Sequence, residues 1–391
     1  MTPTGPAATG RADGRTGGAE PAMRKILLVS NQVMHYRVPV YNWFARRFAE
    51  TGWELIVRAN QLQKENPHAP VFDFKEMEFG IARYKDEIEA IDPDVVILFL
   101  HLRDRIIWPL VHWLKLRRTP VVLWSKAMNY DQPDSLLSRG LYAYMHSLVD
   151  GLILYSEHEL PRLRRRHRHK AFPANNTVNF ESYPDIRESK AEIKRELGIP
   201  FDKVVLSVGR MDVGGGRKNV GHLIEIFRQI DTPGTGLVIV GSGVSSEALS
   251  GLNPRNTIYL GEIHDPRNIR ISKIFKMADL FSIPGHAGLG LNQAFYWGLP
   301  VVTEAGRHPP EIHYLVDGRN GYMVPEGDVN ELRRRILQLL ADDDLRQEFG
   351  RNARADILRH ASIVKMFQGF KDCIDAVADG RCGRRGAVVG A

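Results

Sequence analysis

Short runs of apolar residues alternate with longer amphipathic stretches along almost the whole chain. In the first half these runs are rich in Val, Ile and Leu and occupy residues 25–30, 54–58, 94–100, 120–124 and 151–155. In the second half they occupy residues 203–208, 237–243, 258–263, 279–283, 299–303 and 321–324. Continuous apolar runs separated by helical stretches are typical of parallel strands that helices cover on both faces. The pattern predicts an α/β protein with a parallel sheet in each half.

The length of the chain requires more than one hydrophobic core. At 391 residues it is longer than a single core normally supports, so we expect two doubly wound, Rossmann-like domains that face a cleft. The first covers residues 23–185 and the second residues 186–355, because a charged helical stretch at 188–197 precedes the second set of strands. A final amphipathic stretch at 356–377 has no strand after it and predicts a terminal helix.

The chain shows no pattern for membrane insertion. Residues 1–22 are rich in Gly, Ala, Thr, Pro and charge without apolar periodicity, which predicts a disordered tail rather than a signal peptide. No apolar run approaches the ~20 residues that a membrane span needs. Cys373 and Cys382 are too few for a disulfide framework, and nothing near them has metal-ligand spacing. We therefore expect a soluble, cytoplasmic protein.

Positive charge is concentrated in one segment. The formal net charge is +7 and the sequence pI is near 9.3, and residues 162–170 form the densest basic run, in a predicted helix after Pro161. Such a run can contact anionic lipid headgroups at the inner face of a membrane or an anionic acceptor, or it can be a solvated helix face. The run is not interleaved with aromatic residues, and no known DNA-binding pattern occurs, so we expect no nucleic-acid partner.

Residues 284–303 have the order of an anion-binding site. An apolar strand leads into a turn with several glycines, and a helix follows that is expected to begin near Gly288 or Leu289 and to end before Gly298. A tight turn lets the backbone approach a phosphate, and the following helix directs its free N–H groups and positive dipole end at the same point. The alternative is an ordinary strand–helix–strand unit whose glycines serve close packing.

A second segment upstream adds two cations. The strand at 203–208 ends in Gly209 and Arg210, and a glycine triplet then precedes Lys218 and a predicted helix at 219–227. Ligands of open α/β sheets bind at the carboxyl edge of the strands, which is where this loop lies. A planar guanidinium and a compact ammonium together suit a diphosphate. The alternative is a solvated basic loop.

These segments resemble the donor domain of GT-B glycosyltransferases, specifically the retaining family 4. The matching pieces, in order, are residues 208–210 with 218–224, 237–243, 258–263 with 278–281, and 284–303. The resemblance covers roughly residues 200–350 and implies that a helix at 356–380 crosses back to the first domain. It also implies the following donor-binding residues: Gly209, Arg210, Lys218, Ile263, His286, Gly288, Leu289 and Gln293.

The chain departs from the family pattern at two places. Family members commonly carry two glutamates eight positions apart around the turn, where this chain has Gly285 and Gln293. Gln293 can still hydrogen-bond ribose hydroxyls without a charge, whereas Gly285 leaves the sugar to His286 or to backbone groups, unless the sugar is unusual or catalysis is impaired. The loop between Arg210 and Lys218 is three residues longer than the family spacing, and we expect it to be mobile when empty.

The first domain is expected to supply the acceptor side. His35, Tyr36 and Arg37 follow the first strand in a Tyr-Arg-Val-Pro turn that resembles a subset of the family. His35 can move a proton or bind the acceptor, and Arg37 can bind an acidic group or the donor phosphates; alternatively, His35 caps a helix and Arg37 pairs with a carboxylate. His101 and Lys126, with Asn129, end later strands and complete a polar rim.

The chemistry follows from charge on the departing nucleoside diphosphate. Arg210, Lys218 and the helix start at Gly288 would stabilise that charge in place of a divalent metal, so we expect metal-independent transfer without a cofactor. With His35 these two cations are the predicted catalytic residues. Glu311 either reaches the donor pocket or caps the helix that begins there. The predicted function is a retaining, hexosyltransferase-type glycosyltransferase that transfers a sugar to a saccharide, lipid-linked or small-molecule hydroxyl. The alternatives are another GT-B enzyme, an epimerase or phosphorylase, or a sugar-binding pseudoenzyme.

Overall fold

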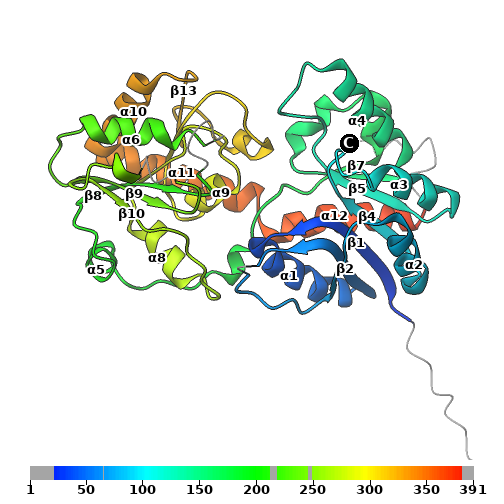
Figure 1. The fold of residues 1–391 in the computed structure, drawn as a ribbon. Helices are drawn as coiled ribbons and strands as arrows, with labels where there is room; N and C mark the ends of the chain where they lie inside the picture. Colours follow the sequence, from blue (N-terminus) through cyan, green and yellow to red (C-terminus); the bar gives the residue numbers. More distant parts are fainter. Residues whose placement is uncertain (1–21, 65, 212–217, 245–248, 381–391) are drawn as a thin grey trace, which may run out of the picture.

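A computed structural model describes residues 22–64, 66–211, 218–244 and 249–380 of the chain (Figure 1). It contains two separate sheets, with strand orders β3-β2-β1-β4-β5-β6-β7 and β10-β9-β8-β11-β12-β13. Every pairing between these strands is parallel. Each sheet has hydrophobic cores on both faces. The predicted α/β architecture of two doubly wound domains is confirmed.

The first domain is built around β1 (Arg24–Val33), whose Leu28 pairs with Val57 on one side and Ile97 on the other. Its further strands and helices are α1 (Val38–Ala49), β2 (Trp53–Leu62), β3 (Asp73–Glu76), α2 (Ile81–Ile91), β4 (Val95–Phe99), α3 (Ile107–Leu116), β5 (Val121–Ser125), α4 (Leu136–Leu148), β6 (Gly151–Leu154) and β7 (Ala171–Pro173). The apolar pattern predicted the five central strands and missed β3 and β7. Both are edge strands with mostly exposed or half-buried residues, so they carry no continuous apolar run.

The second domain follows a short helix, α5 (Lys190–Glu196), which a capping box of Ser189 and Glu192 begins. The remaining elements are β8 (Lys203–Val208), α6 (Val220–Gln229), β9 (Thr235–Val240), β10 (Thr257–Tyr259), α8 (Ile269–Met277), β11 (Leu280–Ser282), α9 (Leu289–Tyr296), β12 (Val301–Glu304), β13 (Gly321–Val324) and α10 (Val329–Ala341). The ends of β8, β9 and β11 lie at the same edge of this sheet, because neighbouring parallel strands finish together.

The predicted terminal helix is two helices rather than one. α11 (Asp343–His360) ends before Ala361, and α12 (Ile363–Ala378) begins after Ser362, whose hydroxyl accepts a hydrogen bond from the Lys365 amide at 3.2 Å. The apolar spacing alone predicts one uninterrupted helix across this position, whereas the serine cap begins a new one. α12 packs on the first sheet, with Met366 and Phe370 in its core, and lies close to β1 and β4 in Figure 1.

The basic segment also differs from its prediction. Instead of one α-helix it forms two 3-10 helices, η2 (Glu157–Arg162) and η3 (Arg165–Lys170), because Leu163 between them is extended and buried. Lys170 is buried as well, and its Nζ donates to the Val149 carbonyl at 2.5 Å. The segment is therefore held against the first domain, and its exposed side chains are arginines and His169.

Candidate functional site

The loop before α6 and the turn before α9 are joined by two hydrogen bonds. Lys218 Nζ donates to the His286 carbonyl at 2.9 Å, and the Gly285 amide donates to the Lys218 carbonyl, also at 2.9 Å. Gly209 lies against the same lysine, since a Cβ at position 209 would be 3.2 Å from Lys218 Cε. Two segments about 70 residues apart in the chain therefore form one small loop cluster at the carboxyl edge of the second sheet.

The start of α9 faces this cluster. The helix begins at Leu289, and its N-cap residue Gly288 makes no side-chain cap. A Cβ on Gly290 would lie 3.6 Å from the Val208 carbonyl, so the first turn sits directly beside the end of β8. The first amides of a helix have no partner within the helix and carry its positive dipole end. The arrangement can receive an anion between β8 and α9.

Close backbone contacts fix the shape of this edge. Gly209 has a φ of 150° and Gly241 a φ of 133°, both in the region that favours glycine. A Cβ at position 241 would be only 1.8 Å from the Gly209 carbonyl oxygen. Arg210 follows with an exposed side chain. Residues 212–217, on which the predicted loop mobility depends, lie outside the described residues.

The predicted end of the turn helix is also present. Gly298 has a φ of 69°, and its amide donates to the Phe295 carbonyl at 3.0 Å. Gln293 is half-buried on α9, and Gly285 lies in the turn before it. These are the two positions at which family members commonly carry glutamates. His308 supports the turn from the next loop, because its buried Nδ1 accepts the Ala287 amide at 3.0 Å. Sequence reasoning had not singled out His308.

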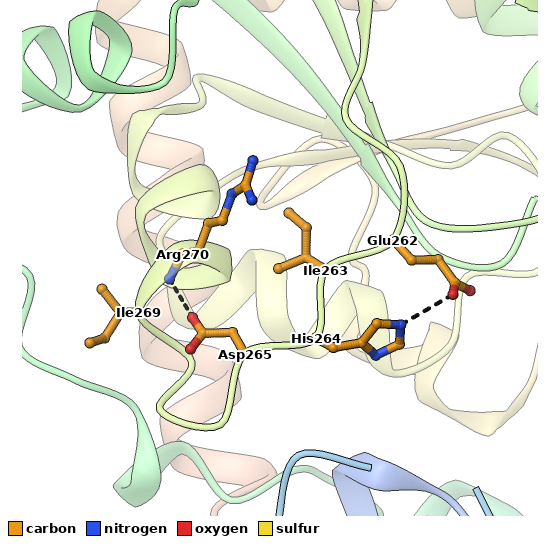
Figure 2. A pocket seen from close by; sticks show the side chains of 6 residues that line it. All are labelled: Glu262, Ile263, His264, Asp265, Ile269 and Arg270. Carbon is orange, nitrogen blue, oxygen red and sulfur yellow. Dashed lines mark hydrogen bonds and ion pairs between the residues drawn. The ribbon is translucent and has the colours of Figure 1, made fainter. Parts of the chain in front are cut away.

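A cavity of about 500 Å³ opens beside the loop after β10 (Figure 2). The residues that line it are Glu262, Ile263, His264, Asp265, Ile269 and Arg270. Glu262 and His264 face each other at 3.2 Å, and the Asp265 carboxylate accepts the Arg270 amide at 2.5 Å. A hydrogen bond from Ser242, with a further one from His264, lowers the pKa of Glu262. Ile263 and Ile269 give this polar-edged cavity an apolar part.

His35 reaches from the first domain toward this cavity. Its ring lies edge-on to the His264 ring at 6.5 Å, and both its Nδ1 and its backbone amide contact Gln63 Oε1, at 2.8 and 3.1 Å. Because the backbone amide must donate, the Gln63 oxygen is the acceptor for both, and Nδ1 carries the proton. Burial lowers the pKa of His35, so the ring is neutral with Nε2 as its acceptor. His35 does not cap a helix, since Met34 is the N-cap residue.

Arg37 holds the interdomain linker instead of facing solvent. Its side chain is buried, stacks over Trp124 at 4.9 Å and donates to Asn176 Oδ1 at 2.7 Å. This placement corrects both predictions for Arg37, because its described hydrogen bonds go to Asn176 and Thr177 rather than to a carboxylate, and its guanidinium is not on the cleft surface.

Asn176 connects the two domains. Its Nδ2 donates to Glu311 Oε1 at 2.5 Å, while its carbonyl accepts Asn292 Nδ2 at 3.0 Å. All of these side chains are buried. Glu311 lies in η5 (Pro310–Tyr314) but does not cap it, so the predicted capping role is wrong. The side chain of Asn176 therefore connects Arg37 of the first domain to η5. The backbone carbonyl of the same residue connects the linker to α9.

A second buried carboxylate lies on the first-domain side. Glu159 Oε1 accepts the Ala127 amide at 2.9 Å and the Tyr130 hydroxyl at 3.2 Å, and Oε2 has no hydrogen-bond partner among the described residues. Burial raises the pKa of Glu159 to about 7, and the charge of Glu311 acts in the same direction. No local sequence signal marks this residue, because its environment comes from three separate segments.

The remaining acceptor-side candidates lie at strand ends. His101 follows β4, and its amide donates to Asp104 Oδ2 at 2.8 Å. Partial burial of its ring lowers its pKa, and the charges of Arg103 and Lys126 act in the same direction. Lys126 lies over the Tyr130 ring at 5.8 Å. Tyr36 packs against the core of the second domain. His101 and Lys126 are thus neighbours on the first domain, whereas His35 and Tyr36 contact the second.

The described residues contain no group of three or more His, Cys, Asp and Glu side chains that could hold a metal ion. No helix in the described part of the chain has both the length and the apolar character needed to cross a membrane.

The chain matches one family model and several curated proteins. The profile of the family described as "Glycosyl transferases group 1" matches residues 189–356. Sulfoquinovosyl transferase SQD2 of Arabidopsis thaliana is 27% identical over 188 residues, which cover 46% of this chain and 35% of that protein. Capsular polysaccharide biosynthesis glycosyltransferase CapM of Staphylococcus aureus is 24% identical over 193 residues, 47% of this chain and 48% of the relative. The chain spans about half or less of the length of the curated relatives it matches.

Solved structures match over nearly the whole chain. Sucrose-phosphate synthase from Thermosynechococcus elongatus superposes with a TM-score of 0.69 at 17% identity, covering 91% of this chain and 100% of the other. HepE from Anabaena, in complex with UDP, superposes with a TM-score of 0.70 at 14% identity, covering 90% and 100%. At these identities the likeness concerns the fold. The chain therefore has the two-domain GT-B fold, and residues 189–356 of its second domain match the group 1 glycosyl transferases.

Proposed function

We propose that this protein is a retaining glycosyltransferase that moves a hexose-type sugar from a nucleoside-diphosphate donor to a hydroxyl of a saccharide, lipid-linked or small-molecule acceptor. The observation that carries the proposal is the loop cluster at the edge of the second sheet. There Gly209, Lys218 and the first turn of α9 converge, and hydrogen bonds of 2.9 Å join the two loops. A diphosphate can meet a cation and free helix amides at this place.

The chemistry proposed for the cluster is stabilisation of the leaving group. When the bond from the anomeric carbon to the diphosphate breaks, negative charge develops on the phosphate oxygens. Arg210, Lys218 and the amides at Gly288 and Leu289 would hold that charge more strongly in the transition state than in the ground state. Each such donor is worth roughly a hundredfold to a thousandfold in rate. The two cations take the place of a divalent metal, so the reaction is proposed to need neither metal nor cofactor.

The cavity at Ile263 is proposed to take the nucleotide base. It offers apolar contact from Ile263 and Ile269 with polar groups at its edge, which suits a flat heteroaromatic ring. Gln293 would bind the ribose hydroxyls, and His286 with backbone groups of the turn would hold the sugar. HepE has been solved with UDP and with UDP-glucose, so uridine nucleotides are the first donors to test.

His35 is proposed to take the proton of the acceptor hydroxyl. The Gln63 contacts leave Nε2 as the acceptor nitrogen, and burial keeps the ring neutral by lowering its pKa. Tyr36, His101 and Lys126 would line the acceptor side. Arg37 has no place in this list, because its guanidinium is buried against Asn176.

One alternative has a specific observation in its favour. Gly285 and Gln293 stand where the family commonly has glutamates, which would suit a sugar-binding protein with little or no transferase activity. An epimerase is disfavoured, because it needs carboxylates around the sugar and this turn has none. The turnover experiment below separates the first alternative from the proposed transferase.

The test is a thermal-shift panel with UDP, GDP, ADP and dTDP and the corresponding sugar nucleotides. The proteins are the wild type, Arg210→Ala and a control, Arg351→Ala, which removes an exposed arginine on α11 far along the chain. A nucleotide should raise the melting temperature of the wild type and the control, lose at least tenfold in affinity in Arg210→Ala and be indifferent to EDTA. If the protein releases free nucleotide from a sugar nucleotide, it is an enzyme. If it binds the sugar nucleotide but releases no nucleotide with any acceptor tested, the result supports the pseudoenzyme. Absence of any shift contradicts the donor site.

A further inference from the structure

The outward face of α4 is more apolar than a solvated helix face requires. Leu136 is 79% exposed, Leu137 76%, Leu141 40% and Tyr144 48%. Residues 137, 141 and 144 follow helical spacing and form one exposed stripe, whereas His146 of the same helix is buried. Four large apolar side chains on one short helix therefore meet water in the isolated chain.

The stripe continues onto α3. The Trp108 ring is stacked on the Tyr144 ring, with centroids 6.3 Å apart and an angle of 14° between the planes. His112 of α3 contacts the Tyr144 hydroxyl through Nε2 at 2.9 Å. Tryptophan and tyrosine of this kind combine an apolar ring with a polar end, which favours the boundary between hydrocarbon and water.

The basic run lies along the other flank of α4. The His167 ring of η3 is 6.1 Å from the His146 ring of α4, and Lys170 is bonded to the carbonyl that follows the helix. These inward contacts fix the segment to α4. The arginines that remain exposed are Arg162, Arg164, Arg165, Arg166 and Arg168 on the run, with Arg139 on α4 itself. The acidic residues close to this flank in sequence are fewer than the arginines: Asp131 and Asp134 lie in the loop before α4, Asp150 after it is paired with Lys115 at 2.6 Å, and exposed Glu157 lies in η2. The flank therefore carries a net positive charge.

We propose that this surface, the exposed stripe of α4 with the arginines of residues 139 and 164–168, binds the face of an anionic lipid bilayer. The leucines and Tyr144 would enter the boundary between headgroups and acyl chains, and the arginines would meet lipid phosphates. An exposed apolar helix face bordered by cations is complementary to such a bilayer in both respects. A second copy of this chain is disfavoured as the occupant, because the two basic flanks would repel each other.

The proposed bilayer contact at α4 lies near the acceptor side of the first domain. The helix follows β5, and Lys126 lies in the same connection, with His101 close enough for its pKa to be lowered by that lysine. A bilayer bound at α4 would therefore lie beside the rim of the first domain that we assign to the acceptor. The membrane contact itself does not depend on the proposed transfer reaction.

Flotation of the full-length chain with lipid vesicles tests the proposal. The vesicles are phosphatidylcholine alone, or phosphatidylcholine with about one third phosphatidylglycerol. The wild type should float only with the anionic vesicles, and binding should weaken as salt rises. Leu137→Gln/Leu141→Gln should lose roughly tenfold or more in partitioning. Arg164→Gln/Arg165→Gln/Arg166→Gln should lose about fivefold per cation and most of the salt dependence.

The control is Leu358→Gln, which removes another exposed leucine, 47% exposed, on α11 of the second domain. It should float as the wild type does. Because the substituted side chains are exposed, all variants should melt at the temperature of the wild type. Their melting curves therefore check that a loss of binding is not caused by unfolding. The proposal fails if the wild type binds neither vesicle, if Leu358→Gln weakens binding as much as the α4 variant, or if the α4 variant changes only a concentration-dependent self-association, which would assign the surface to a second copy.

Discussion

The buried carboxylate of Glu159 should make the stability of the protein fall as the pH rises. The side chain is only 1% exposed, and burial raises its pKa from the ordinary 4.5 to about 7. Glu159→Gln keeps the shape of the side chain and its acceptor oxygen for the Ala127 amide, but it cannot ionise. Comparison of the two proteins at several pH values therefore isolates the cost of the buried charge.

The sign and size of the effect follow from proton linkage. Below pH 4.5 Glu159 is protonated in both the folded and the unfolded state, and it contributes nothing to the pH dependence. Between 4.5 and about 7 the folded state holds the proton more tightly, so the free energy of unfolding decreases with rising pH. At about 1.4 kcal/mol for each pH unit, this interval amounts to about 3 kcal/mol. Glu159→Gln should thus become more stable relative to the wild type by about 3 kcal/mol between pH 4.5 and 8.

Buried histidines make the opposite contribution, which is why the difference between variants is measured. Burial lowers the pKa of His146 to about 3 and the pKa values of His167 and His313 to about 4. Their contribution to stability is present above pH 6.5 and is lost as the pH falls. It is common to both proteins and cancels in the difference.

The assay is urea unfolding at pH 5, 6, 7 and 8, followed by tryptophan fluorescence. Glu157→Gln, at an exposed position two residues earlier in η2, is the control and should track the wild type at every pH. If the stability difference between Glu159→Gln and the wild type stays constant across this range, or shrinks as the pH rises, Glu159 is not a buried acid of raised pKa and the reasoning is refuted.

Three further predictions concern the linker, the last helix and the acceptor base. Asn176→Ala removes hydrogen bonds to two buried charged groups, Arg37 and Glu311, and should cost about 3–6 kcal/mol in unfolding free energy; a loss under about 1 kcal/mol by urea unfolding would contradict the network. Gly369→Ala would bring a Cβ to 2.4 Å from the Pro173 carbonyl, so it should destabilise the protein by about 1–3 kcal/mol. The control is Gly140→Ala on α4, whose Cβ would meet nothing within 4 Å and which should stabilise the protein by about 0.5–1 kcal/mol. Equal melting temperatures for the two variants would disprove the close packing of α12. If His35 is the base, the transfer rate should be level at neutral pH and fall below pH 6.5, because its pKa is lowered from that value, and His35→Asn should lose both rate and the acid limb; a variant that keeps the limb excludes His35 as its source.

Much of the fold could be read from local apolar patterning. The runs at 203–208 and 321–324 are strands with the same bounds in the structure, and α9 begins at Leu289 as the glycine-rich turn predicts. A buried parallel strand is continuous in apolar residues, so its signal is contained in its own few residues. Edge strands lack that signal, and the break at Ser362 depends on a cap rather than on hydrophobic spacing.

The sequence by itself determined the α/β class, the two sheets and the order of the motifs that form the edge of the second sheet, because each depends on neighbouring residues and their spacing. Only the tertiary structure decided how the domains meet. Arg37, Asn176 and Glu311 are more than 130 residues apart at each step, and a buried polar group takes whichever partner the packing brings within reach. The pKa of Glu159 and the exposed stripe of α4 have the same origin, since burial belongs to the packed chain and not to any residue within it.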